Sequence, residues 1–342
     1  MNSSISQQVL SGMRPTGQLH LGHLHGVLKN WVQLQHEHRC YFFVADWHAL
    51  TTEYDNTSVI AKSVWDMVID WLAVGINPGE ATLFIQSKVP EHAELHLLLS
   101  MSTPLSWLER IPSYKDQQQK LKDKDLSTYG FLGYPLLQSA DILVYKAGLV
   151  PVALETAQAL VDNQQNISLG DKKRLLGYLE GSSKTILPEP EPLLTQTAKM
   201  PGLDGQKMSK SYKNTIALRE PPAAIDKKIR TMPTDPARMR RTDPGDPEKC
   251  PVWQFHKIYS NEETKTWVQN GCSSAGIGCL ECKQPVIESI LAELAPIRER
   301  ALGYIEEPES VRAIVSEGCE QARATARETL DEVRQAMGLA YR

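Results

Sequence analysis

Two short segments of the chain carry side chains that suit phosphate chemistry. The first is TGQLHLGH, residues 16–23, which follows a short apolar run and opens a helix-like segment. Gly17 and Gly22 let the backbone approach a flat ligand, and a helix N-terminus offers free N–H groups to phosphate. His20 and His23 can add imidazole N–H donors. Taken alone, the pattern is equally typical of a glycine-rich turn with two solvated histidines.

The second segment is GQKMSKS, residues 205–211, in which Lys207 and Lys210 stand among small residues. Two ammonium groups on a mobile loop can fold onto a triphosphate and stabilise the charge that develops on leaving pyrophosphate. A loop of this composition is also typical of an ordinary solvated surface.

Four of the six cysteines lie within residues 250–282, with the spacing C-x21-C-x6-C-x2-C. They are Cys250, Cys272, Cys279 and Cys282. Four thiolates suit Zn²⁺ or an iron–sulfur cluster. Zinc ribbons usually contain two C-x2-C pairs, and only one is present here, which favours a cluster. We expect the other two cysteines, Cys40 and Cys319, to be packing residues.

The elements that must position these segments alternate in type. Residues 9–13, 40–45 and 82–85 have the apolar character of buried strands, and residues 21–34 and 60–72 have apolar side chains at helical spacing. This order predicts an α/β fold with a Rossmann-like, doubly wound parallel sheet. Ligands of such sheets bind beyond the carboxyl ends of the strands.

The second part of the chain has a different pattern. Strand signals fade beyond Glu220, and residues 288–304 and 311–337 are amphipathic at helical spacing. We therefore expect a catalytic α/β domain over residues 1–218 and a helical domain over residues 219–342.

Composition excludes several classes of protein. The 342 residues suggest about two domains, and 41% hydrophobic and 23% charged residues are typical of a globular protein rather than a disordered or fibrous one. A net charge of -4 excludes coating of nucleic acid by global charge. No run approaches the ~18 apolar residues of a membrane helix, and residues 1–10 do not resemble a signal peptide. We expect a cytoplasmic protein with no membrane contact.

The two segments together resemble the signature pair of class I aminoacyl-tRNA synthetases. The resemblance narrows to the tryptophanyl enzymes in SGMRPTGQLHLGH (residues 11–23), ADWHALT (45–51) and YPLLQSADILVYKA (134–147). TDPARMRRTDPGDPEKCPV (234–252) resembles the bacterial form that carries a 4Fe–4S cluster. The match covers most of residues 9–152 and 188–342.

The resemblance implies ATP-dependent activation of L-tryptophan to tryptophanyl-adenylate, followed by transfer to tRNA(Trp). Activation is an in-line attack of an ionised carboxylate on the α-phosphate, so it needs positioning and charge stabilisation rather than a general base. The resemblance further implies Mg²⁺ on the phosphates, a homodimer, and a helical domain that binds the tRNA anticodon. An enzyme similar to tyrosyl-tRNA synthetase is the nearest alternative.

The resemblance also assigns site residues. The catalytic residues are His20, His23, Lys207 and Lys210. The ATP-binding residues are Arg14, Thr16, Gly17, Gly22, Lys207, Met208, Ser209, Lys210 and Ser211. On one face of a predicted helix, Tyr134, Gln138 and Asp141 bind tryptophan, with Asp141 accepting the indole N–H; a capping or salt-bridging role for Asp141 is the alternative. Arg238, Arg240 and Arg241 suit either tRNA phosphates or ion pairs with nearby aspartates.

The resemblance is interrupted between two well-matched regions. After Val152 the family has Gly-x-Asp-Gln, which contacts the ATP ribose and the amino acid; residues 153–187 lack this motif. Lys213 stands where the family usually has Gly. A catalytically impaired homologue that binds nucleotide or tRNA is therefore a second hypothesis. An abrupt change at both ends is typical of two compensating reading-frame shifts; the alternative is a divergent, replaced segment.

Overall fold

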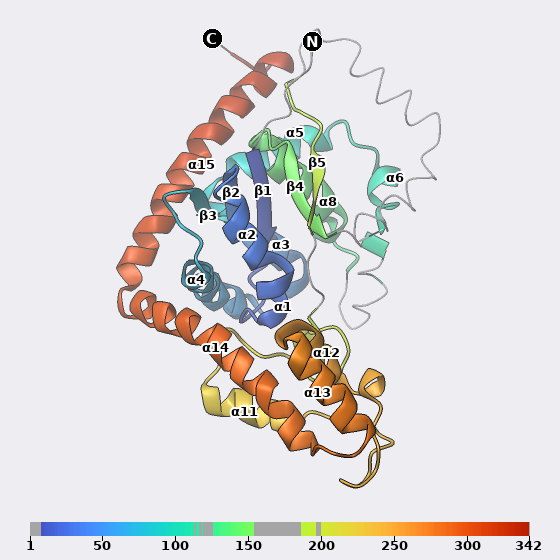
Figure 1. Ribbon diagram of the computed structural model, residues 1–342. Helices are drawn as coiled ribbons and strands as arrows, with labels where there is room; N and C mark the ends of the chain where they lie inside the picture. The colour runs from blue at the N-terminus through green and yellow to red at the C-terminus, as the bar shows by residue number, and fades with distance from the viewer. Residues whose placement is uncertain are drawn as a thin grey trace.

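The five strands of the sheet are all parallel. In a computed structural model, which describes residues 8–341 except 113, 116–117, 119–125, 154–185 and 196–199, the order across the sheet is β3-β2-β1-β4-β5 (Figure 1). The strands are β1 (Gln8–Met13), β2 (Arg39–Val44), β3 (Ala81–Ile85), β4 (Leu149–Ala153) and β5 (Glu191–Thr195). The predicted Rossmann-like sheet is confirmed. Because the strand order reverses between β1 and β4, their carboxyl ends form the topological switch point where ligands of such sheets bind.

Helices of the first half connect and cover these strands. They are α1 (Leu21–His23), the π-helix η1 (Leu24–Leu28), α2 (Lys29–Leu34), α3 (Asp46–Glu53), α4 (Thr57–Val74), the 3-10 turn η2 (Gln86–Lys88), α5 (Glu91–Ser100), α6 (Leu105–Leu108) and α8 (Tyr129–Val144). The α4 helix ends at Gly75, whose φ of 119° is a left-handed cap.

The later part of the chain is helical, as expected. It contains the 3-10 turns η3 (Lys210–Tyr212) and η4 (Pro247–Lys249), with α11 (Pro222–Arg230), α12 (Pro251–Tyr259), α13 (Glu262–Ser273), α14 (Cys279–Glu306) and α15 (Pro308–Ala336). The last helix runs along the β3 edge of the sheet (Figure 1). Gly318 permits this approach, because a Cβ there would stand 2.0 Å from the carbonyl oxygen of Leu83.

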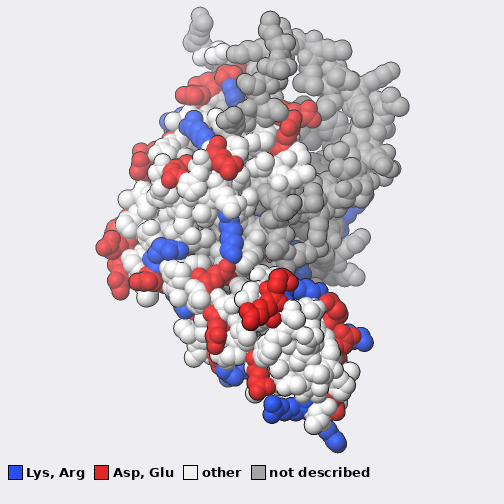
Figure 2. Space-filling model, viewed as in Figure 1, with Lys and Arg blue, Asp and Glu red and all other residues white. Residues whose placement is uncertain are grey.

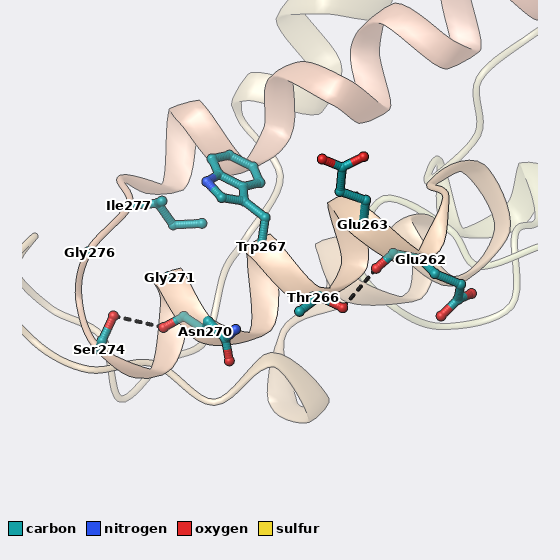
Figure 3. A pocket seen from close by; sticks show the side chains of 9 residues that line it. All are labelled: Glu262, Glu263, Thr266, Trp267, Asn270, Gly271, Ser274, Gly276 and Ile277. Atoms are coloured by element: carbon teal, nitrogen blue, oxygen red, sulfur yellow. Dashed lines mark hydrogen bonds between the residues drawn. The ribbon is translucent and has the colours of Figure 1, made fainter.

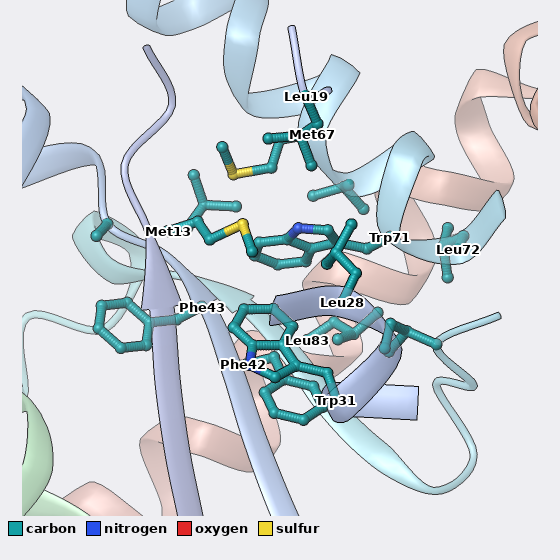
Figure 4. Packing of buried hydrophobic residues seen from close by; sticks show 14 of the residues in the cluster. Met13, Leu19, Leu28, Trp31, Phe42, Phe43, Met67, Trp71, Leu72 and Leu83 are labelled. Carbon is teal, nitrogen blue, oxygen red and sulfur yellow. The ribbon is translucent and has the colours of Figure 1, made fainter. Parts of the chain in front are cut away.

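The helix that begins at the first signature is anchored in the core by aromatic packing. Trp31 stacks on Phe42 of β2 at 4.2 Å between ring centroids and meets the edge of Trp71 of α4 at 5.2 Å. Met13 and Met67 lie beside the Trp71 indole (Figure 4). The apolar faces predicted for residues 21–34 and 60–72 are the buried faces of these helices. This core fixes the helix whose first turn carries His20 and His23.

Among the helices of the described part, none has the length and apolar character needed to cross a membrane.

Candidate active site

The two signature histidines cap the helix that follows β1. Nδ1 of His20 accepts the backbone N–H of Gly22 at 3.1 Å, and Nδ1 of His23 accepts the backbone N–H of His20 at 3.2 Å. Each ring therefore carries its proton on Nε2, which remains a donor. Burial lowers the pKa of His20 to about 4 and that of His23 to about 2, helped by the positive charge of Lys210. Both rings are neutral at pH 7.

The glycines of this loop have two distinct roles. Gly17 has a φ of 104°, a conformation that strongly favours glycine. A Cβ on Gly22 would stand 2.9 Å from the His20 imidazole, so Gly22 makes room for the capping ring. Thr16 donates its backbone N–H to the carbonyl of Arg14, whose side chain is exposed.

The second signature loop is held by Asn214, which is 3% exposed. Its Oδ1 accepts the backbone N–H of Ser209 at 2.8 Å, and its Nδ2 donates to Asp204 at 2.7 Å and to the carbonyl of Lys207 at 3.2 Å. Met208 is buried, whereas the Lys207 side chain is exposed. The backbone of Ser211 lies in η3, and its side chain lies outside what the structure describes.

Lys210 joins the two signatures. Its Nζ donates to the carbonyl oxygen of Gly17 at 2.9 Å and to that of Thr16 at 3.2 Å. Burial lowers the pKa of this ammonium to about 8, and the negative charge of Asp70 opposes that shift. The backbones pair as well, because Leu21 donates to Ile216 at 3.0 Å and Leu218 donates to Leu19 at 3.1 Å. The two signature segments are therefore in contact, and a shared ATP site between them stays a prediction.

Asp141 is the centre of a buried network. Its Oδ1 contacts Nδ1 of His92 at 2.6 Å and Nε2 of Gln86 at 2.8 Å, and its Oδ2 contacts Nε2 of His48 at 2.7 Å. The other nitrogen of His92 lies 2.7 Å from the hydroxyl of Tyr145. These hydrogen bonds and neighbouring histidine charges hold the pKa of Asp141 at about 2, against the opposing effect of burial.

Tyr134 and Asp141 meet through His48, whose ring lies edge-on to the Tyr134 ring at 6.4 Å between centroids. Tyr134 and Leu137 line a cavity of about 330 Å³ with Trp47 and His96, and Asp141 does not line it. Gln138 is exposed, and the structure places it at neither that cavity nor the Asp141 network.

The four clustered cysteines line one small cavity, of about 20 Å³, together with Asp235. They come from three helix ends: Cys250 precedes α12, Cys272 lies in the last turn of α13, and Cys279 and Cys282 lie in the first turn of α14. Within the described ranges, no group of three or more His, Cys, Asp or Glu side chains is arranged to hold a single metal ion.

Burial disfavours thiolate at two of the cysteines, and an arginine partly offsets that effect at one of them. Burial raises the pKa of Cys272 above its usual range, and the positive charge of Arg238, whose Nη1 lies 3.8 Å from Sγ, reduces that rise. A Cβ on Gly245 would stand 2.7 Å from the same sulfur, so the glycine leaves room for it. Burial and the neighbouring thiols raise the pKa of Cys282 to about 12.

The three arginines before the cysteines differ in environment. Arg238 is buried and donates to the carbonyls of Arg241 at 3.0 Å and Ile277 at 2.6 Å, so it has a structural role in this loop. Arg240 and Arg241 are exposed, and Arg241 lies 3.5 Å from Glu281.

Sequence reasoning did not single out His48, His92, Asn214 or the pair of Asp70 with Arg219. One signal was available for Asp70, which is a lone carboxylate between Met67 and Trp71 in an otherwise apolar helix stripe. The interruption at residues 153–187 lies mostly outside the described residues, since 154–185 are not described.

Comparisons with known proteins assign the family. Residues 4–295 match the model of tRNA synthetases class I (W and Y). The tryptophan–tRNA ligase of Ralstonia nicotianae is 58% identical, covering 98% of this chain and 99% of the relative. That of Thermotoga maritima is 48% identical, covering 98% and 100%. The tryptophanyl-tRNA synthetase of Campylobacter jejuni, solved with ADP and tryptophan, is 30% identical with a TM-score of 0.81, covering 97% and 100%. The chain therefore belongs to the class I tRNA synthetases and, within them, to the bacterial tryptophan–tRNA ligases.

Proposed function

We propose that the two signature loops bind ATP between them and carry the activation step of this tryptophan–tRNA ligase. The contact of Lys210 with Gly17 is the observation that supports the proposal most directly, because it places an ammonium at the turn that opens the capped helix. When the tryptophan carboxylate attacks the α-phosphate, negative charge accumulates on the leaving pyrophosphate. Lys210 and the exposed Lys207 stabilise that charge.

His20 and His23 serve as neutral donors in this scheme. Each keeps its Nδ1 engaged with a backbone N–H, so each can offer Nε2–H to phosphate oxygens. Mg²⁺ enters with the phosphates of ATP and neutralises part of their charge. It needs few protein ligands for that role.

Asp141 is proposed as the acceptor of the indole N–H. A carboxylate offers about four lone-pair sites; Gln86 and His92 use those of Oδ1, and His48 uses one of Oδ2. One acceptor site on Oδ2 therefore remains for a ligand donor. Tyr134, which meets His48, is proposed to line the amino-acid site; Gln138 stays a prediction from the resemblance.

Exchange of pyrophosphate into ATP tests this function. The rate should depend on tryptophan and should not respond to tyrosine at equal concentration. Exchange driven equally by tyrosine would contradict the assignment of specificity, and binding of ATP with no exchange by any amino acid would favour the impaired homologue.

We further propose that Cys250, Cys272, Cys279 and Cys282 hold a 4Fe–4S cluster. Four thiols around one cavity supply the donor set, and the presence of only one C-x2-C pair makes Zn²⁺ the weaker alternative. The small size of the cavity means that the thiols must move apart to admit a cluster. When bound, the group would cross-link the ends of α12, α13 and α14.

The helical residues 219–342 are proposed as the tRNA(Trp)-binding domain, beside a catalytic domain of residues 1–218. Figure 2 shows both signs of charge interspersed over the described part of one face, so binding must use local groups. Arg240 and Arg241 are exposed. Nε of Arg241 would lie 3.7 Å from a Cβ on Gly278, and the preceding Ile277 lines a hollow of about 700 Å³ on α13. Trp267 and Glu263 project from one side of that helix there, with Ile277 beside the indole (Figure 3), an arrangement that suits stacking of an unpaired base.

A homodimer is proposed because α5 and α6 expose large apolar side chains. Leu97, Met101 and Leu105 are 54%, 70% and 60% exposed, and the first two lie on one helix face. Sedimentation of the protein and of Met101→Glu tests this; a wild-type monomer would contradict it. A cytoplasmic location stays a prediction.

A further inference from the structure

A buried carboxylate stands beneath the two signature loops. Asp70 of α4 is 1% exposed, and its Oδ1 lies 2.7 Å from Nε of Arg219. The same carboxylate accepts the backbone N–H of Leu19. Nη2 of Arg219 also donates to Oδ1 of Asp66 at 2.7 Å. A charge is costly to bury, so its place between these groups requires a physical reason.

The partners of Asp70 belong to the two segments that carry the signatures. Leu19 precedes His20, and Arg219 directly follows the stretch that pairs with residues 19–21. Leu19 lies against Met67 of α4 in the core (Figure 4). Asp70 therefore connects both segments to α4: Arg219 links it to the chain after the second signature loop, and Leu19 links it to the start of the first signature helix.

We propose that Asp70, paired with Arg219, is a positioning residue for the activation step. It holds the two signature segments in register, and its negative charge favours the protonated form of Lys210 where pyrophosphate leaves. This inference rests on the proposed role of Lys210.

The charges around Lys210 explain how Asp70 affects the pKa of its ammonium. Asp70 from α4 is the charged group that acts on Lys210, whereas His20 and His23, whose pKa values Lys210 helps to lower, are neutral. Those that act on Asp70 are Arg219 and Asp66. Burial lowers the pKa of Lys210 to about 8 and raises that of Asp70 to about 7. Loss of the Asp70 charge therefore lowers the Lys210 pKa further and leaves less ammonium at neutral pH.

The direct test measures the Lys210 amine without any assay of activity. Trace acetylation with acetic anhydride, read by peptide mass spectrometry across pH, reports the fraction of free amine at each lysine. In the full-length protein the Lys210 midpoint should lie near pH 8. Asp70→Asn, which keeps the acceptor for Leu19, should move the midpoint lower and raise labelling at pH 7.5 by about threefold. An unmoved midpoint overturns the proposal.

Asp226→Asn is the matched control. Asp226 forms an exposed ion pair with Arg230 on α11, and its loss should leave the Lys210 midpoint in place. A shift of the same size in this variant would mean that net charge, rather than the buried pair, sets the effect, and would also overturn the proposal.

A second pair of variants covers the case in which Asp70→Asn fails to fold. Arg219→Gln removes the counterion, so the Asp70 pKa rises and the carboxylate loses its charge at pH 7.5. The Lys210 midpoint should then fall, and Arg219→Lys should restore it. In pyrophosphate exchange, Arg219→Gln should lower kcat by about tenfold with an unchanged KM for tryptophan. Equal midpoints in both arginine variants would contradict the proposal even if exchange is absent in every protein.

Discussion

The ammonium of Lys210 lies 2.9 Å from the carbonyl oxygen of Gly17, although 193 positions separate the two residues in the chain. The second signature loop is thus already folded onto the first. The carbonyl oxygens of Thr16 and Gly17 accept hydrogen bonds from the Lys210 ammonium, and phosphate oxygens must replace them when ATP binds. When ATP binds, the ammonium can exchange these carbonyl oxygens for phosphate oxygens, so its net stabilisation of bound ATP is small. We expect it to stabilise the transition state more, because negative charge then develops on the leaving pyrophosphate.

Removal of either signature lysine should therefore affect rate more than affinity. We expect Lys207→Ala and Lys210→Ala to lower the activation rate by about 10²-fold or more, with a smaller change in ATP affinity. Single-turnover exchange at saturating ATP measures the rate. Equal losses in rate and affinity would indicate simple ground-state binding.

The first three strands and the helices between them were predictable because their apolar spacing directly reports burial. Strands β4 and β5 were not identified, since Pro151 and Pro192 interrupt their strand patterns. The structure tolerates both prolines: the register of β4 with β1 pairs only Val9 with Leu149, and β5 is an edge strand.

The candidate site was predictable where neighbouring residues carry the chemistry, as in His20 and His23. The Asp141 network was not, because its partners lie 49 to 93 positions away and meet only when α3, α5 and α8 pack. The role of Gly22 also emerges only from the position of the capping imidazole.

Asp141→Asn should impair tryptophan recognition. The amide replaces one acceptor oxygen by an N–H₂ group, which cannot accept a hydrogen bond from the donors around it. We therefore expect a raised KM for tryptophan and weaker discrimination against tyrosine. Breaking a buried charged network also costs about 3 kcal/mol of stability, measurable by urea unfolding. A stability loss with unchanged tryptophan kinetics would assign Asp141 a structural role only.

The cysteine site predicts a selective pattern of iron loss. Protein purified without oxygen should be brown and contain about four irons. Cys272→Ser should lose that iron because thiolate is the preferred ligand, whereas Cys40→Ser and Cys319→Ser should retain it, since both residues are buried away from the other four. Stoichiometric zinc without iron would contradict the prediction.

Lys213 should be replaceable by glycine with a gain in stability. It ends η3 with a φ of 53°, a left-handed conformation that costs a non-glycine residue about 1 kcal/mol. We expect Lys213→Gly to raise the free energy of unfolding by up to about 1 kcal/mol. Lys227→Gly, on the exposed side of α11, is the control and should lower it by a similar amount. A loss in both variants would show that Lys213 makes compensating contacts.

We expect the segment after β4 to set how fast this chain activates tryptophan. β4 ends at Ala153 beside β1, so the family's Gly-x-Asp-Gln would emerge at the topological switch point of the sheet. Residues 153–187 lack the motif, so nucleotide and tryptophan should be held less firmly. We predict that the chain as written folds but activates tryptophan poorly.

Exchange of residues 153–187 for a segment of this family that begins with Gly-x-Asp-Gln should raise pyrophosphate exchange by about 10²-fold, because the motif would position the nucleotide and the amino acid for attack. The same segment with its motif aspartate changed to alanine is the matched control. If two reading-frame shifts produced the present segment, another frame of the same DNA encodes Gly-x-Asp-Gln directly after Val152; its absence from both alternative frames would reject that origin. Robust exchange by the unmodified chain would instead mean that Glu155, Gln158 or another group supplies the contacts of the motif.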